Sequence, residues 1–177
     1  MAGQDLPCFA NASSTSPEEA ITFSLVLTSI LLSRYNRFTK SGGVPLKALE
    51  RFGRPPLPVG VHAPGHVDVT DEKAREAFWP RYREVIRSVS ETRGFAIPTR
   101  ESFLHEVGPQ GALYVGSPET VAQKIAANLP ALGATRFDLK YGMGGLSHQA
   151  LMTTIELYGT QVVPRVRQLL VEAQGRC

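Results

Sequence analysis

Residues 111–125 read Gly-Ala-Leu-Tyr-Val-Gly-Ser-Pro-Glu-Thr-Val-Ala-Gln-Lys-Ile. The first half is a short apolar run bounded by glycines, which predicts a buried strand. Ser117 and Pro118 then supply a helix cap and a first helical position. Val121 and Ile125 repeat at the spacing of a buried helical face. This stretch therefore predicts a strand that turns directly into a helix.

Similar units lie on both sides of this one. Residues 59–62 predict a short strand that Pro64-Gly65 closes, and Thr70 then caps a helix that ends at Gly94. Residues 100–107 predict a further short helix, residues 136–141 a third strand, and a last helix begins near Ser147. Strands this short, separated by helices, predict parallel pairing with crossover connections and hence an α/β fold.

Parallel strands collect ligands at their carboxyl ends. We expect that edge to include His62, His66, Gly116, Ser117, Tyr141, Gly142 and Met143.

Composition excludes several other classes of protein. The 177 residues carry a net charge of +3 with Lys and Arg dispersed, so no nucleic-acid partner is expected. Cys8 and Cys177 stand at opposite ends, without the spacing of a metal site, which predicts a reducing, cytoplasmic setting. The apolar run 21–32 is shorter than the roughly 20 residues that a membrane helix needs. It predicts a buried strand and no membrane association.

Four blocks together resemble one known family. They are Pro-Val-Gly-Val-His-Ala-Pro-Gly-His (58–66), residues 111–125, Arg-Phe-Asp-Leu-Lys-Tyr (136–141) and Ile-Glu-Leu-Tyr-Gly-Thr-Gln-Val-Val-Pro-Arg-Val (155–166). In this order they resemble the carboxyl-terminal part of the luciferase-like monooxygenases, the bacterial-luciferase-like flavin-dependent oxidoreductases, over about residues 49–170. The resemblance implies a truncated, partial (β/α)8 TIM-type barrel, roughly its last four β/α units. Residues 1–14 are then a poorly ordered terminus, and 15–177 an incomplete barrel domain.

The resemblance also implies a chemistry. A flavin-dependent oxidoreductase of this class acts as a monooxygenase on a small organic substrate, with reduced flavin and O2. The cofactor is FMN or the related deazaflavin F420, and the partners are a flavin reductase or further copies of the chain. Ser-Pro-Glu-Glu at 16–19, before an apolar strand, resembles the turn that holds the flavin phosphate, so Thr15 and Ser16 become candidate phosphate ligands. The alternative is a non-catalytic remnant or interaction domain that binds no flavin.

Each candidate residue also has a purely structural interpretation. Ser16 and Ser117 can simply cap their own helices. His62 and His66, expected just past a strand end, can donate a proton or orient substrate, or else pack a loop. They are not expected to bind metal, because Pro64-Gly65 excludes a helix and no third ligand follows.

The segment after the third strand has two interpretations as well. Tyr141, Gly142 and Met143 can lie against a flavin ring, because glycine allows close backbone approach and methionine packs on aromatic faces. They can also form a plain turn.

Overall fold

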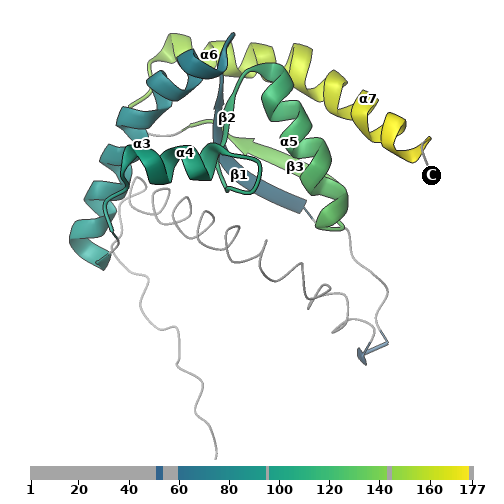
Figure 1. The fold of residues 1–177 in the computed structure, drawn as a ribbon, viewed down its shortest axis with the longest axis horizontal. Coiled ribbons are helices and arrows are strands. Elements are labelled where there is room, and N and C mark those ends of the chain that lie inside the picture. The colour runs from purple at the N-terminus through teal and green to yellow at the C-terminus, as the bar shows by residue number, and fades with distance from the viewer. Residues whose placement is uncertain (1–50, 54–59, 95, 143–144, 176–177) are drawn as a thin grey trace, which may run out of the picture.

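The computed structural model describes residues 51–53, 60–94, 96–142 and 145–175. Its elements are β1 (Gly60–Val67), α3 (Asp71–Arg93), α4 (Arg100–Val107), β2 (Tyr114–Gly116), α5 (Pro118–Ala131), β3 (Arg136–Lys140), α6 (His148–Leu157), the π-helical turn η1 (Tyr158–Val162) and α7 (Val163–Gln174). The fold is a mixed α/β arrangement in which helices surround a small sheet (Figure 1).

All three strands of the sheet run parallel, as the sequence predicted. Their order is β2-β1-β3, so β1 is the central strand. The three residues of β2 pair with the last residues of β1, whereas β3 pairs with the first part of β1. The chain therefore passes from one edge of the sheet to the other between β2 and β3.

The central strand is longer than predicted. We expected Pro64-Gly65 to close it, but β1 continues to Val67. Gly65 permits this continuation because a Cβ at that position would overlap the carbonyl oxygen of Tyr114 and the side chain of Leu139. The glycine lets the neighbouring strands approach β1 closely, and it does not mark a turn.

Local capping signals fix the helices where the sequence placed them. Thr70 Oγ1 accepts a hydrogen bond from Lys73 N at 3.3 Å, and α3 runs unbroken through Pro80. It ends at Gly94, whose φ of 68° lies in the left-handed region that glycine favours. The helices α4 and α5 likewise occupy the predicted ranges.

Two apolar clusters form the core, on opposite faces of β2. The first joins β1 and β2 to α5 and α7, and includes Tyr114. The second joins β2 to α3 and α4, and includes Val115 and Phe78. Because side chains alternate along a strand, consecutive residues of β2 enter different clusters.

The last helical segment is interrupted near Gly159 and Pro164 by the π-helical turn η1. Its buried stripe includes Thr154, which is fully buried, whereas the neighbouring Ile155 is 42% exposed. A stripe through Thr154, Tyr158 and Val162 keeps the four-residue spacing of one helical face.

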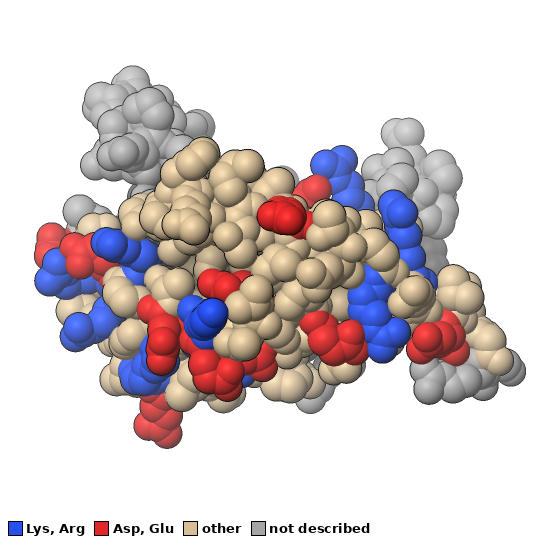
Figure 2. Space-filling view, turned by 90° about the horizontal axis from the view of Figure 1, so that it is seen from above, with Lys and Arg blue, Asp and Glu red and all other residues tan. Residues whose placement is uncertain are grey.

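The side of the molecule formed by α6 and α7 has a mixed surface. Seen from that side, most acidic and basic side chains lie toward the borders of a broad area that carries few of them (Figure 2). Met152 on α6 is 49% exposed. No helix among the residues that the structure describes is long and apolar enough to cross a membrane.

Candidate functional site

The carboxyl ends of the three strands lie at one end of the sheet. Val67, the last residue of β1, pairs with Gly116, the last residue of β2. Lys140, the last residue of β3, pairs with Pro64, so β3 stops before its neighbours do. Since all strands are parallel, their ends share one edge, as the sequence predicted.

His66 lies at this edge but within the strand and completely buried. Its Nδ1 is 2.8 Å from Thr154 Oγ1, which also donates to Val67 O at 3.1 Å and accepts from Val67 N at 3.3 Å. Its ring stacks against Phe78 with a centroid distance of 6.4 Å. Burial lowers the pKa of His66, while Asp68 acts in the opposite direction.

The other ring nitrogen of His66 is unusual. Nε2 is buried without a hydrogen-bond partner among the described residues, and the nearest carboxylate oxygen, Asp68 Oδ2, is 4.0 Å away. An unpaired buried polar atom costs free energy unless something else satisfies it. This atom is therefore the most distinctive polar feature that the structure places near the strand ends.

His62 does not share this position. It was expected at a strand end, but β1 continues five residues beyond it, and its side chain is exposed. Four residues of strand separate the two histidines by about 13 Å. Partial burial and the nearby Lys140 lower the pKa of His62, and Asp138 opposes them. The two histidines therefore do not form a pair.

Ser117 caps α5, as predicted, but its amide is already occupied. Asp71 Oδ1 accepts a 2.6 Å hydrogen bond from Ser117 N, and Asp71 Oδ2 accepts one from Thr120 Oγ1 at 3.1 Å. The Ser117 hydroxyl donates to Thr120 Oγ1 at 3.1 Å. A carboxylate from α3 thus holds the amino end of α5, where an anion would otherwise bind.

The segment after β3 is open to solvent. Tyr141 is 38% exposed, and a Cβ added at Gly142 would meet no atom within 4 Å. Thr15, Ser16 and Met143 lie outside the described residues. The structure thus brings His66, Ser117, Tyr141 and Gly142 to one end of the sheet and leaves His62 part-way along β1.

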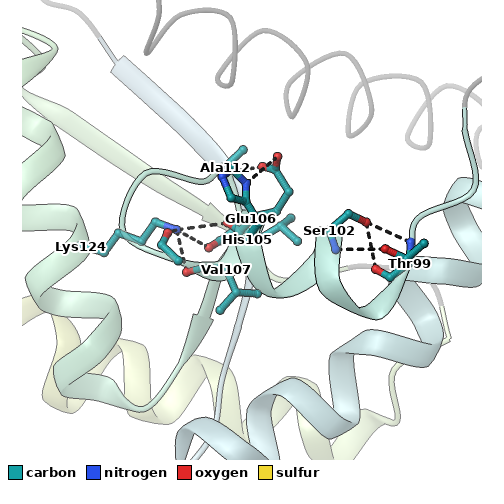
Figure 3. Close-up of polar contacts among 9 residues, drawn as sticks. Thr99, Ser102, His105, Glu106, Val107, Ala112 and Lys124 are labelled. Atoms are coloured by element: carbon teal, nitrogen blue, oxygen red, sulfur yellow. Dashed lines mark hydrogen bonds and ion pairs between the residues drawn. The ribbon is translucent and has the colours of Figure 1, made fainter.

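A buried lysine, which sequence reasoning missed, forms a second polar cluster. Lys124 on α5 is 7% exposed, and its Nζ donates toward four backbone carbonyl oxygens at the end of α4 and in the following loop (Figure 3). They belong to Glu106 at 3.4 Å, Val107 at 3.0 Å, Gly108 at 2.6 Å and Leu113 at 2.7 Å.

Two opposing effects act on this ammonium group. Burial lowers the pKa of Lys124 to about 7, and the charge of Glu106 acts in the opposite direction. The carbonyl oxygens at the carboxyl end of α4 carry partial negative charge and favour the protonated form. Nζ also lies 4.9 Å from the ring centroid of Tyr114. Lys124 thus satisfies the last carbonyl groups of α4 and joins that helix to α5.

A signal for this burial was present in the sequence. Lys124 lies three residues after Val121 and next to Ile125, within the apolar stripe of α5. A lysine at that spacing either extends its ammonium group to water or binds buried acceptors. Only the position of the α4–β2 loop decided between these outcomes.

Comparisons with known proteins agree with the α/β fold. No family model matches the sequence, and no curated protein matches it. The crystal structure of monooxygenase RslO1 from Streptomyces bottropensis is similar in fold, with a TM-score of 0.55 and 15% identity over 84% of this chain and 39% of that chain. This chain therefore spans about two fifths of RslO1.

Two further structures are more distantly similar. One is the FMN complex of the oxygenating constituent of 3,6-diketocamphane monooxygenase from Pseudomonas putida, a type II Baeyer-Villiger enzyme (TM-score 0.45, 19% identity, 68% of this chain and 37% of that chain). The other is apo-MsnO8 (TM-score 0.45, 16% identity, 73% of this chain and 41% of that chain). Identities this low establish a shared fold with part of RslO1 and nothing narrower.

Proposed function

We propose that this chain is part of a luciferase-like, flavin-dependent oxidoreductase that acts as a monooxygenase on a small organic substrate. The observation that supports this most is the common edge at which three parallel strands end, in a chain with the fold of part of RslO1. In such folds the carboxyl edge carries the ligand. The net reaction places one oxygen atom of O2 in the substrate and reduces the other to water, with two electrons from reduced flavin.

The described residues fit one end of a flavin better than the other. The open backbone at Gly142 and the exposed Tyr141 leave room for a flat ring. The amino end of α5, in contrast, is less suited to a phosphate, because Asp71 already accepts the hydrogen bond of Ser117 N. For the phosphate we propose Thr15 and Ser16, as the resemblance of residues 16–19 to the family's phosphate-binding turn implies.

The remaining candidates take supporting roles in this proposal. His66 offers an unsatisfied ring nitrogen that a group of the substrate or of the completing part of the barrel would bind. Met143 lies beside Gly142 in sequence and would pack on the ring. His62 would contact substrate only if the site extended along β1. Reduced FMN would come from a flavin reductase, whereas the alternative cofactor F420 would transfer a hydride and not activate O2. Further copies of the chain are candidate partners.

A flavin titration tests the proposal. FMN and F420 are added separately to the full 177-residue chain, and binding is followed by quenching of cofactor fluorescence. We expect saturable binding that a Thr15→Ala, Ser16→Ala double variant weakens by about ten-fold or more, the loss expected for one or two charge-assisted hydrogen bonds. Ser117→Ala should change the affinity by less than about two-fold.

One observation favours a second function, a non-catalytic interaction domain. Among the described residues, only α5 begins directly after a strand. The hydrogen bond from Ser117 to Asp71 occupies the amino terminus of this helix, so that it is less available to a flavin phosphate. A chain that binds neither FMN nor F420, alone or mixed with candidate partner chains, would support this second function and reject the first.

A further inference from the structure

A cavity of about 610 Å³ runs along the side of α5 that faces α4. This volume lies within the range of small-molecule sites. Its wall includes the apolar side chains of Val107, Pro109 and Ala127 and the polar side chains of Arg75, Thr120 and Lys124. The cavity is separate from the open segment at Tyr141 and requires no flavin.

Arg75, which lines this cavity, has a hydrogen-bond donor without a partner. Its Nε is buried and has no partner among the residues that the structure describes. Nη2, on the same side of the planar guanidinium group, makes only a long contact of 3.5 Å to Asp71 Oδ2. Asp71 is itself held by Ser117 N and Thr120 Oγ1, so it cannot turn to serve Nε without losing both.

The charge of the cavity favours an anion. Lys124 places a second basic group in the wall, which carries a positive charge when protonated, and its Nζ is already committed to backbone carbonyl oxygens. It can therefore attract an anion without binding it directly. Arg75 is the candidate for a direct contact, because its Nε lacks a partner and the donors of a guanidinium group can match the two oxygens of a carboxylate.

We propose that this cavity binds a small aliphatic carboxylate, with the carboxylate on Arg75 and the hydrocarbon chain against Pro109 and Ala127. The anion would satisfy the buried Nε, and the chain would cover apolar surface that now faces the cavity.

Hexanoate titration of the full chain tests this proposal. Nuclear magnetic resonance of the arginine Nε–H groups reports on Arg75, and we expect a saturable shift of its signal. Arg75→Gln should weaken binding at least about ten-fold, as expected for the loss of a charge-assisted hydrogen bond. Lys73→Gln removes the same charge from an exposed position on the same helix and should change the affinity by less than about two-fold.

A third variant keeps the proposal testable if Arg75→Gln does not fold. Ala127 is exposed on α5, so Ala127→Leu fills the cavity while all charges remain. It should also weaken hexanoate binding about ten-fold. An unchanged affinity in Ala127→Leu would overturn the proposal. Equal losses of hexanoate affinity in Lys73→Gln and Arg75→Gln would also overturn it. The same is true if hexanol or inorganic phosphate binds as tightly as hexanoate, or if the hexanoate titration of the wild-type chain shows no saturation.

Discussion

The carboxylate of Asp71, the first residue of α3, accepts a 2.6 Å hydrogen bond from the backbone amide of Ser117, which caps α5. Thr120 donates to the same carboxylate at 3.1 Å. One acidic side chain thus serves the first turns of two helices that follow neighbouring strands. This contact joins the two β/α units at the edge of the sheet where the proposed flavin would bind.

Replacing this carboxylate should loosen that junction. Asp71→Asn keeps the shape of the side chain but removes the charge that strengthens both hydrogen bonds. We expect a loss of about 1.5 kcal/mol in the free energy of unfolding, measured by urea denaturation at neutral pH. Glu72→Gln removes a charge from the same helical turn at an exposed position and should cost much less. Equal losses in the two variants would show that only the helix dipole is involved.

The same contact predicts a response to acid. Partial burial raises the pKa of Asp71, but the hydrogen bonds from Ser117 and Thr120 outweigh it and hold the pKa below its ordinary value. A lowered carboxyl pKa stabilises the fold above the unfolded pKa of about 4, and this contribution is lost as the pH falls through the folded pKa. The stability gap between wild type and Asp71→Asn should be constant above about pH 5 and narrow below about pH 4. A gap independent of pH would contradict this assignment.

His66 should make stability depend on pH in a second range. Burial lowers its pKa, so the unfolded chain binds a proton more readily than the folded chain does. Stability should therefore fall as the pH drops below about 6.5, the ordinary histidine value. His66→Gln should flatten urea-derived stability between about pH 7 and pH 5, while His62→Gln should largely retain the slope because His62 is exposed. If the free energy of unfolding of His66→Gln depended on pH as steeply as that of wild type, His66 would not be the cause of this dependence.

Lys124→Met should destabilise the α4–β2 loop. Methionine fills a similar space but donates no proton, so buried carbonyl oxygens such as that of Leu113 lose a donor. We expect a loss of about 2–4 kcal/mol in the free energy of unfolding. Gln123→Met, at the neighbouring exposed position, is the matched control and should lie within about 0.5 kcal/mol of wild type. Hydrogen exchange should show faster exchange of Leu113 N–H, which donates to Glu106 O in the same loop.

Gly65→Ala tests why β1 continues past the predicted end. An added methyl group would overlap the Tyr114 carbonyl oxygen, which belongs to the backbone and cannot move aside cheaply. We expect a loss of about 3 kcal/mol or failure to fold. Gly60→Ala on the same strand meets only Arg136 side-chain atoms, at 3.8 Å or more, and should be tolerated. Thermal unfolding of both variants checks this, and equal stability would contradict the close approach.

The sequence alone determined the helices and the direction of the strands. Thr70 and Ser117 bind backbone amides three residues ahead, so their signals are local and readable without the rest of the fold. The helix at Arg100–Val107 was also predicted with the same limits, and in the structure Thr99 and Ser102 bind each other's backbone amides. Parallel pairing followed from the lengths of the connections.

Only the tertiary structure decided what surrounds each polar side chain. Pro64-Gly65 resembled a turn because the close approach of Tyr114, distant in sequence, could not be foreseen. Two other contacts could not be foreseen for the same reason. Asp71 and Ser117 lie 46 positions apart in the sequence, and Lys124 lies 11 to 18 positions from the carbonyl groups that it binds at the end of α4 and in the following loop. Local hydrogen bonds are encoded in a few consecutive residues, whereas burial and long-range pairing depend on where the packed sheet and helices place their neighbours.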